Sequence, residues 1–288
     1  MKDTNILISA GAEINKSLEL LGDMETYDDV LNDFLNLIDE KINNLNKYKS
    51  INDMASYAVD VHSLKSDVRY LGFMALGDMA YDLELLSKAN DLAGVSAKHD
   101  ALINEVNKVV NACKKYLLGE EGKEEMQSEE EFNIDEKLDP MSEALALQGI
   151  MPKKSASSGS PKQGTILIVD DSQIVSNFIK KVFENDYEVV LCKDGQGAID
   201  YCHSEEKRSR IKACLLDLNM PNVNGFEVLD FFKENNYFVK LPVVVISGVE
   251  EVDLIQKAKS YPIVEVLAKP FNERDLEMAL NRCLATYF

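Results

Sequence analysis

The chain has 288 residues, which is long enough for two domains of ordinary size, each with its own core. Its apolar and charged fractions, 45% and 28%, are those of a soluble globular protein and exclude a disordered or fibrous one. The net charge of −19, from 50 acidic against 31 basic residues, disfavours nucleic acid and anionic membrane surfaces as partners.

Cysteine usage and hydropathy predict a cytoplasmic protein. The cysteines are widely spaced and form no C-x-x-C pair, as is typical of reduced core residues: Cys113, Cys192, Cys202, Cys214 and Cys283. The longest apolar stretch, 241–249, is far shorter than the roughly 20 residues that span a bilayer. Residues 6–12 are too short for a signal-peptide core.

Residues 1–118 are predicted to form an antiparallel helical bundle. Apolar residues recur at spacings of three and four along 30–45 and again along 54–71, and further helical patterns cover 77–89 and 96–117. Within the second stretch, His62, Lys65, Ser66 and Arg69 share one helix face beside the apolar stripe, so His62 is expected to be accessible to solvent. An unperturbed imidazole offers a neutral nucleophilic nitrogen at pH 7, and the two cations would attract an anionic phosphoryl group.

Residues 119–163 are predicted to be a flexible linker. Between Glu120 and Asp139 ten acidic residues stand against two lysines, and a Ser-, Pro- and Lys-rich run follows a short helix-like patch at 141–148. Such a composition buries too little apolar surface to offset its ordering entropy. A flexible chain of this length would have an end-to-end distance of roughly 35 to 40 Å.

Residues 164–288 are predicted to form an α/β domain. Five Val- and Ile-rich strands, at 165–170, 188–192, 213–217, 242–247 and 263–267, alternate with helical patterns, which favours a parallel sheet covered on both faces. Ligands of such sheets bind beyond the carboxyl ends of the strands. At those ends lie five polar residues: Asp170, Asp171, Asp217, Ser247 and Lys269.

This set of residues predicts phosphoryl transfer to Asp217. Crowded carboxylates repel one another unless a divalent cation binds between them, and an oxygen-lined site with open positions suits Mg²⁺. A carboxylate beside Mg²⁺ can attack phosphorus, while the metal, a lysine and a hydroxyl meet the charge on the transferred group. Taken singly, Asp171 and Ser247 would as readily be helix caps or turn residues, and Lys269 a surface lysine.

The stretch from about Thr165 to the C-terminus resembles the receiver domains of two-component response regulators, through Asp170-Asp171, Asp217-Leu-Asn-Met-Pro with Gly225, Ser247 and Lys269-Pro-Phe. The resemblance implies a five-stranded, flavodoxin-like sheet of order 2-1-3-4-5. It makes Asp217 the phosphoacceptor and assigns metal binding to Asp170, Asp171, Asp217 and the backbone carbonyl of Asn219. Ser247 would be the switch hydroxyl and Lys269 the phosphate-sensing cation. Val266 stands where receivers often carry an aromatic, which puts the usual aromatic switch in question.

Residues from about Leu18 to Leu118 resemble histidine phosphotransfer (HPt) domains. The motif His62-Ser-Leu-Lys65-Ser66 followed by Leu71-Gly72 is similar to the family's H-S-L-K-G pattern, with Ser66 in place of the usual glycine. The resemblance implies that His62 is a phosphoacceptor and Lys65 part of its site. A histidine on a helix face is by itself usually unremarkable. His99 and His203 lie in segments that look like polar surface and are assigned no role.

The sequence therefore predicts a phosphorelay protein that carries phosphate on Asp217 and His62, between a sensor kinase and other receiver or HPt proteins, with possible contact between its own two domains. It is expected to be a signalling protein rather than an enzyme, with a receiver that catalyses its own Mg²⁺-dependent phosphorylation and dephosphorylation. An alternative is a phosphorylation-gated adaptor whose bundle only docks partners. An aspartyl-phosphate hydrolase is disfavoured, since Asn219 stands where that class needs a second Asp.

Overall fold

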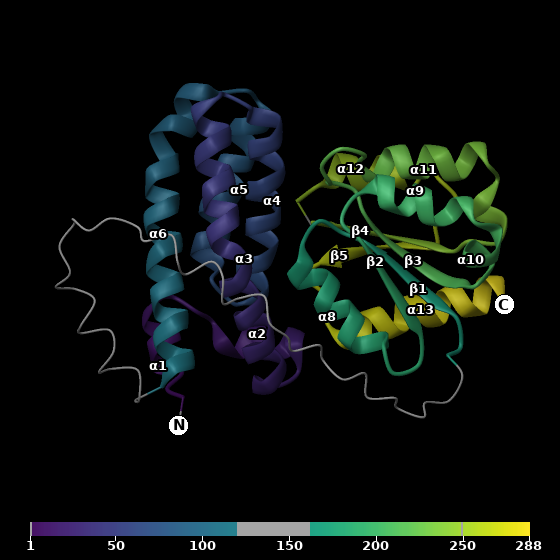
Figure 1. Cartoon of the computed structure of the whole chain (residues 1–288), viewed down its shortest axis with the longest axis horizontal. Helices are drawn as coiled ribbons and strands as arrows, with labels where there is room; N and C mark the ends of the chain where they lie inside the picture. The colour runs from purple at the N-terminus through teal and green to yellow at the C-terminus, as the bar shows by residue number, and fades with distance from the viewer. Residues whose placement is uncertain (1, 120–161, 249) are drawn as a thin grey trace, which may run out of the picture.

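The computed structural model describes residues 2–119, 162–248 and 250–288, which form a helical domain and an α/β domain (Figure 1). Apart from residues 119 and 162–163, the predicted linker and its helix-like patch lie outside the described residues. Among the residues described, no helix is long and apolar enough to cross a membrane.

The helical domain has six helices in its described part, and the four longest form the bundle. These are α3 (Met24–Ser50), α4 (Met54–Tyr70), α5 (Met74–Lys88) and α6 (Leu92–Leu118), joined by three-residue loops that make consecutive helices antiparallel. Two short helices precede them: α1 (Asn5–Ser9) packs on α6, and α2 (Ile14–Leu21) packs on α3 and α4. The predicted bundle is confirmed, and the apolar stripes of 30–45 and 54–71 face its core.

The loops of the bundle explain where its helices stop and start. Asn52 and Asn90 adopt left-handed backbone conformations, and the next residues, Asp53 and Asp91, cap the following helices by accepting backbone N–H bonds. Gly72 fills the corresponding place between α4 and α5 with φ +83°, and a Cβ there would lie 2.6 Å from Ser17 Oγ. The loop between α4 and α5 therefore requires glycine.

The α/β domain is a parallel five-stranded sheet of order β2-β1-β3-β4-β5, which confirms the predicted order. The strands are β1 (Thr165–Val169), β2 (Glu188–Cys192), β3 (Ile211–Asp217), β4 (Val243–Gly248) and β5 (Glu265–Lys269). The connecting helices are α8 (Gln173–Phe183), α9 (Gly195–His203), α10 (Glu205–Ser209), α11 (Gly225–Glu234), a 3-10 turn η2 (Tyr237–Val239), α12 (Val252–Ala258) and α13 (Glu273–Tyr287).

Alternation along the strands gives the sheet two buried faces. Ile166, Ile168, Leu215 and Ile246 share one apolar cluster with residues of α8 and α13, whereas Leu167, Val169, Leu216 and Val245 share another with residues of α9, α11 and α12. Strand β5 begins and ends two residues later than predicted, and its last residue is Lys269. All five cysteines are buried and unpaired by disulfides, as predicted.

The two domains dock through α8, which packs against α3 and α4 (Figure 1). An aromatic group joins them: Tyr70 lies 5.9 Å, centroid to centroid, from both Phe178 and Phe271, and its hydroxyl accepts a hydrogen bond from the Phe271 N–H at 3.2 Å. Polar contacts flank this group, including Ser172 Oγ to Asp67 Oδ1 at 2.7 Å, in a buried position. The docking is therefore apolar at its centre and turns the carboxyl ends of the strands towards α4.

Candidate functional site

Three carboxylates meet at the carboxyl ends of β1 and β3. Asp170 and Asp171 follow β1 directly, and Asp217 ends the neighbouring β3, so that one oxygen from each lies within 4.8 Å of the others. Lys269, at the end of β5, donates to Asp217 Oδ2 at 2.7 Å and forms an ion pair with Asp170 Oδ2 at 2.8 Å. The predicted residues are thus brought together.

Burial of these charges shifts their protonation. Desolvation, reinforced by the charge of Asp217, raises the pKa of Asp170 to about 6, although Lys269 opposes the shift. Desolvation and the neighbouring carboxylates also raise the pKa of Asp171 well above its usual value. Burial alone would lower the pKa of Lys269, but Asp170 and Asp217 outweigh it and hold that pKa well above its usual value. The cluster carries an excess of negative charge that a cation would relieve.

Gly225, the first residue of α11, permits the tight turn beside Asp217. A Cβ on Gly225 would lie 2.2 Å from the Asp217 carbonyl oxygen and 2.7 Å from Leu218 Cα, both of which are backbone atoms. The same turn lets the Asn219 N–H donate to Asp217 Oδ1 at 3.3 Å. Glycine at this position therefore positions the carboxylate through the backbone.

Ser247, near the end of β4, is fully buried and is held by an acid that the sequence did not single out. Its Oγ donates to Glu251 Oε2 at 2.6 Å, and the Gly248 N–H donates to the same oxygen at 3.0 Å. The Asn219 side-chain amide donates to Glu251 Oε1. Glu251 thus links the ends of β3 and β4.

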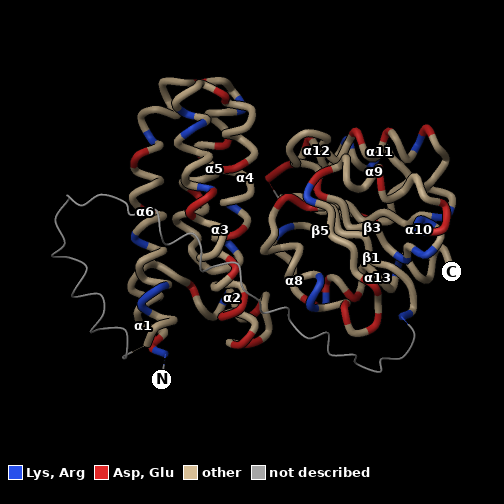
Figure 2. The backbone as a smooth tube through the Cα atoms, in the orientation of Figure 1, with Lys and Arg blue, Asp and Glu red and all other residues tan. Residues whose placement is uncertain are grey.

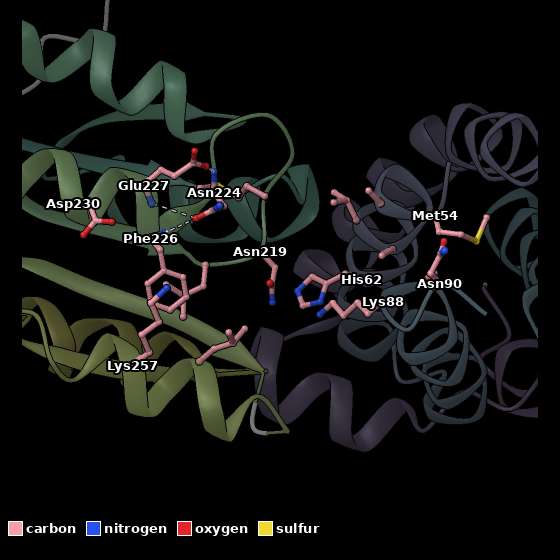
Figure 3. Close-up of a pocket in the computed structure, with 17 residues that line it drawn as sticks. Met54, His62, Lys88, Asn90, Asn219, Asn224, Phe226, Glu227, Asp230 and Lys257 are labelled. Carbon is pink, nitrogen blue, oxygen red and sulfur yellow. Dashed lines mark hydrogen bonds between the residues drawn. The ribbon is translucent and has the colours of Figure 1, made fainter. Parts of the chain in front are cut away.

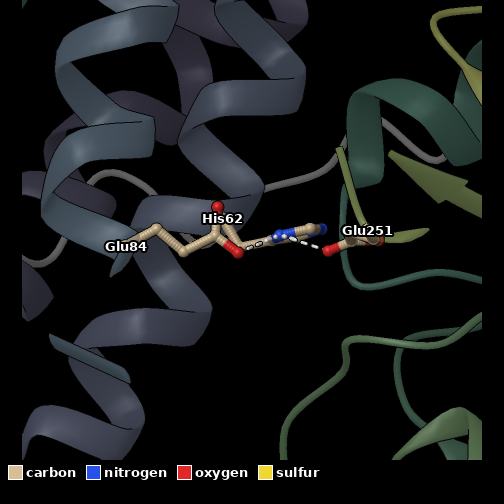
Figure 4. Close-up of side chains that lie close together, drawn as sticks. All are labelled: His62, Glu84 and Glu251. Atoms are coloured by element: carbon tan, nitrogen blue, oxygen red, sulfur yellow. Dashed lines mark hydrogen bonds and ion pairs between the residues drawn. The ribbon is translucent and has the colours of Figure 1, made fainter. Parts of the chain in front are cut away.

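His62 lies on α4 against this edge of the α/β domain, and it is not accessible to solvent as predicted. Only 2% of its surface is exposed. The prediction was wrong because the helix face that carries His62 is covered by the docked α/β domain and by Glu84 from α5, neither of which helical periodicity can reveal. Its Nδ1 lies 3.6 Å from Glu251 Oε1 across the domain boundary (Figure 4).

Glu84 fixes the orientation and the tautomer of His62. Its Oε1 lies 2.8 Å from His62 Nδ1, and because a carboxylate only accepts, this hydrogen bond requires a proton on Nδ1. Burial alone would raise the pKa of Glu84, but the hydrogen bond from His62 and the charges of Lys65 and Lys88 hold it well below its usual value. His62 Nε2 is buried and has no hydrogen-bond partner within the described part of the chain.

Lys65 and Arg69, which share the helix face of His62, bind the acidic loop after β4. Lys65 Nζ lies 2.8 Å from Glu84 Oε2 and 3.1 Å from Glu250 Oε1, and Arg69 donates to the same Glu250 oxygen at 2.7 Å. Figure 2 shows this acidic segment beside α12, turned towards the bundle. Lys65 is therefore buried between two carboxylates.

A cleft of about 670 Å³ opens between the domains next to His62. Figure 3 shows His62 and Lys88 on its bundle side facing Asn219 on the other. A second cavity brings His62, Lys65, Ser66 and Arg69 together with Gly248 and Lys269. The imidazole therefore borders the same small cavity as Lys269, whereas Asp170 and Asp171 line a separate cavity with residues of α3 and α4.

Glu84, Glu250 and Glu251 were not predicted from the sequence as site residues. Glu84 falls on the buried stripe of α5 with Ala80, Leu83 and Ser87, and an acid on such a stripe was a detectable signal. Glu250 and Glu251 directly follow the Ser247 turn. His99 also differs from expectation: it is buried, with Nδ1 bonded to the Tyr57 hydroxyl at 3.0 Å and Nε2 to Asn46 at 2.8 Å.

Two family models match the chain. The response regulator receiver domain matches residues 166–281, and the Hpt domain matches residues 29–112. The chain is an Hpt domain joined to a response regulator receiver. It is a phosphorelay signalling protein of the two-component system, and the predicted family is confirmed.

Several known proteins are similar to the chain. The probable methanogenesis regulatory protein FilR2 of Methanothrix harundinacea is 32% identical over 121 residues, which cover 40% of this chain and 78% of that protein. The response regulator Rcp1 of Synechocystis is 31% identical, covering 42% and 86%. Sporulation initiation phosphotransferase F of Bacillus subtilis is 28% identical, covering 41% and 92%. The solved chemotaxis protein CheY4 of Vibrio cholerae aligns with a TM-score of 0.38 at 25% identity, covering 42% of this chain and 99% of that one.

The acidic cluster of the receiver fits Mg²⁺. Its donors are carboxylate oxygens, and within the described residues Asp171 Oδ1 is buried without a hydrogen-bond partner. A cation there would also relieve the repulsion that raises the pKa values of Asp170 and Asp171.

Proposed function

We propose that the protein passes a phosphoryl group between Asp217 of the receiver and His62 of the Hpt domain. The observation that carries the proposal is the docking of the two domains, in which His62 and Lys65 line one cavity with Gly248 and Lys269 of the receiver. Because the two sites lie in one chain, each would meet the other at an effective concentration on the order of millimolar even when the domains separate. The direction of net phosphoryl transfer would be set by the partner proteins.

In this proposal, His62 acts through Nε2. The lone pair of Nε2 attacks phosphorus, an N–P bond forms, the P–O bond to Asp217 breaks, and the electron pair of that bond returns to the Asp217 carboxylate. The ring then carries a positive charge, which the Glu84 carboxylate at 2.8 Å from Nδ1 balances. In the reverse direction the retained Nδ1 proton lets the imidazole leave as a neutral group.

The receiver residues have complementary parts. Asp217 would be the acceptor, while Lys269 and Ser247 would meet the charge on the transferred oxygens. Asp170, Asp171, Asp217 and the carbonyl of Asn219 would hold Mg²⁺, which when bound neutralises that charge. The receiver would thereby catalyse its own phosphorylation and dephosphorylation.

A sensor histidine kinase or another receiver or Hpt protein would supply and receive the phosphoryl group. The buried, unpaired cysteines fit a reducing compartment, and the cytoplasm is where we place the protein. No partner of nucleic acid is proposed, because the net charge is −19.

The proposal is tested by phosphotransfer from a panel of kinases and phosphorylated receivers to the full chain, to His62→Ala and to Asp217→Ala. Phosphohistidine is lost in acid and acyl phosphate in base, so the label can be assigned to each site. Each substitution is expected to abolish one class of label, and His203→Ala, at the end of α9, should retain both. Label on neither site would contradict the relay.

The adaptor alternative draws on one observation, the burial of His62 under the receiver, which a gated docking surface would also show. The same variants separate the two functions. Signalling that persists in His62→Ala and is lost in Asp217→Ala would favour the adaptor.

A further inference from the structure

Glu251 is the acid on which the two halves of the site converge. Its carboxylate is buried and accepts hydrogen bonds from Ser247 Oγ, the Gly248 N–H and the Asn219 side-chain amide. Its Oε1 also lies 3.6 Å from His62 Nδ1, and Figure 4 shows the two side chains facing each other. Within the described residues, three donors of the receiver are thus committed to one carboxylate.

These donors border Asp217. In the sheet register Asp217 pairs with Ile246, the residue before Ser247, and the Asn219 N–H donates to Asp217 Oδ1 at 3.3 Å. A phosphoryl group on Asp217 would add negatively charged oxygens to this corner of the site. Ser247 has a single hydroxyl proton, so it cannot donate to Glu251 and to a phosphoryl oxygen at the same time.

We propose that Glu251 is a positioning residue that occupies the Ser247 hydroxyl before transfer and that the phosphoryl group on Asp217 must displace it. This inference rests on the proposed role of Asp217. The carboxylate opposes phosphorylation in two ways, through its negative charge and through its hold on the donor that the phosphoryl oxygen needs.

The displacement also couples the receiver to the Hpt domain. Once released from Ser247, the Glu251 carboxylate remains beside His62, where Glu84 already accepts from Nδ1. The same loop carries Glu250, which holds Lys65 and Arg69 of α4. The loop after β4 would thus move when Asp217 is phosphorylated, and it contacts the face of α4 that carries His62.

The test is the initial rate of phosphorylation of the full chain by labelled acetyl phosphate with Mg²⁺. In this reaction an Asp217 oxygen attacks phosphorus, a P–O bond forms, and the P–O bond to acetate breaks so that acetate leaves with the electron pair. Glu251→Gln removes the charge and weakens the acceptor, and we expect labelling about tenfold faster than in the wild type.

Two variants separate this effect from looser docking. Glu250→Gln removes a neighbouring charge that pairs with α4 and has no contact with Ser247 among the hydrogen bonds of the described residues. It weakens docking without freeing the Ser247 hydroxyl, so it should change the rate less than about twofold. In a Ser247→Ala background, Glu251→Gln should have almost no effect, because the donor that it frees is absent. A purely structural role for Glu251 would not depend on Ser247.

The proposal is overturned if Glu251→Gln is labelled no faster than the wild type, if Glu250→Gln is accelerated equally, or if the full acceleration persists without Ser247. Failure of the proposed function is recognised separately. In that case Asp217→Ala would still take up base-labile label from acetyl phosphate.

Discussion

At the scale of single residues, His62 is defined by what surrounds it rather than by its own helix. The sequence placed it correctly beside Lys65 and Arg69 on one face of α4. Its burial was not predictable, because Glu84 reaches it from another helix and Glu251 from another domain. Helical periodicity describes one element at a time and cannot report contacts between elements.

Glu84 makes a prediction about pH. Because its pKa is lowered in the folded protein, its contribution to stability is complete above the usual glutamate pKa, near 4.5, and is lost as the pH falls below that value. Glu84→Gln should therefore be less stable than the wild type at pH 7 and should lose less stability between pH 5 and 3. Thermal unfolding followed by circular dichroism measures both.

Glu105→Gln is the matched control, because Glu105 pairs with Lys108 at the surface of α6. It should follow the wild-type pH profile. Parallel pH profiles of stability for the wild type and Glu84→Gln would contradict the ion pairs that Glu84 forms beside His62.

At the scale of elements, most of the fold was predictable. Two apolar stripes and two further helical patterns predicted the bundle, and five Val- and Ile-rich runs between helical patterns predicted the parallel sheet, since both signals are local. The start of β5 was misplaced because Ile263 and Val264 continue the apolar run although the strand begins at Glu265. The short helices α1 and α2 were not predicted, because eight residues or fewer give a weak periodic signal.

The turn between β3 and α11 makes the second prediction. Gly225→Ala should destabilise the receiver by about 1 to 3 kcal/mol, because its Cβ would press on backbone atoms of Asp217 and Leu218 that cannot move aside. Denaturant unfolding of the full chain would measure the loss. Gly248→Ala is the comparison, since its Cβ would meet side-chain atoms rather than backbone, those of Glu250 at 3.2 Å and of Glu251 at 3.6 Å. Equal stability of the two variants would contradict the tight turn.

The third prediction concerns the contact between α4 and the receiver. Tyr70→Phe keeps the aromatic packing with Phe178 and Phe271 but leaves the buried Phe271 N–H without its acceptor. Docking should weaken by about 1 to 3 kcal/mol. Hydrogen–deuterium exchange of the Phe271 amide and of α4 should become faster.

Tyr57→Phe tests whether that effect belongs to the interface. It removes a hydrogen bond of similar length, 3.0 Å to His99 Nδ1, wholly inside the bundle. Exchange at Phe271 should then stay as in the wild type. Exchange that is unchanged in Tyr70→Phe, or equally fast in both variants, would argue against this docking contact.

At the scale of the whole molecule, docking places the two sites next to each other and makes them inaccessible to other proteins. His62 is 2% exposed in the docked arrangement, so another receiver can reach it only after the domains separate. Transfer within the chain and transfer to an outside partner would then compete. Both candidate phosphoacceptors were predictable from the sequence, whereas the docking of their domains depends on a surface match between α8 and the face formed by α3 and α4.

The most direct test of the central claim is the fate of the phosphoryl group within one chain. Asp217 is loaded with labelled acetyl phosphate, excess donor is removed, and the conversion of base-labile to acid-labile label is followed at several protein concentrations. We predict a first-order conversion whose rate does not change on dilution and which His62→Gln abolishes. A rate that falls in proportion to protein concentration, or release of the label as inorganic phosphate equally in wild type and His62→Gln, would contradict transfer between Asp217 and His62 of the same chain.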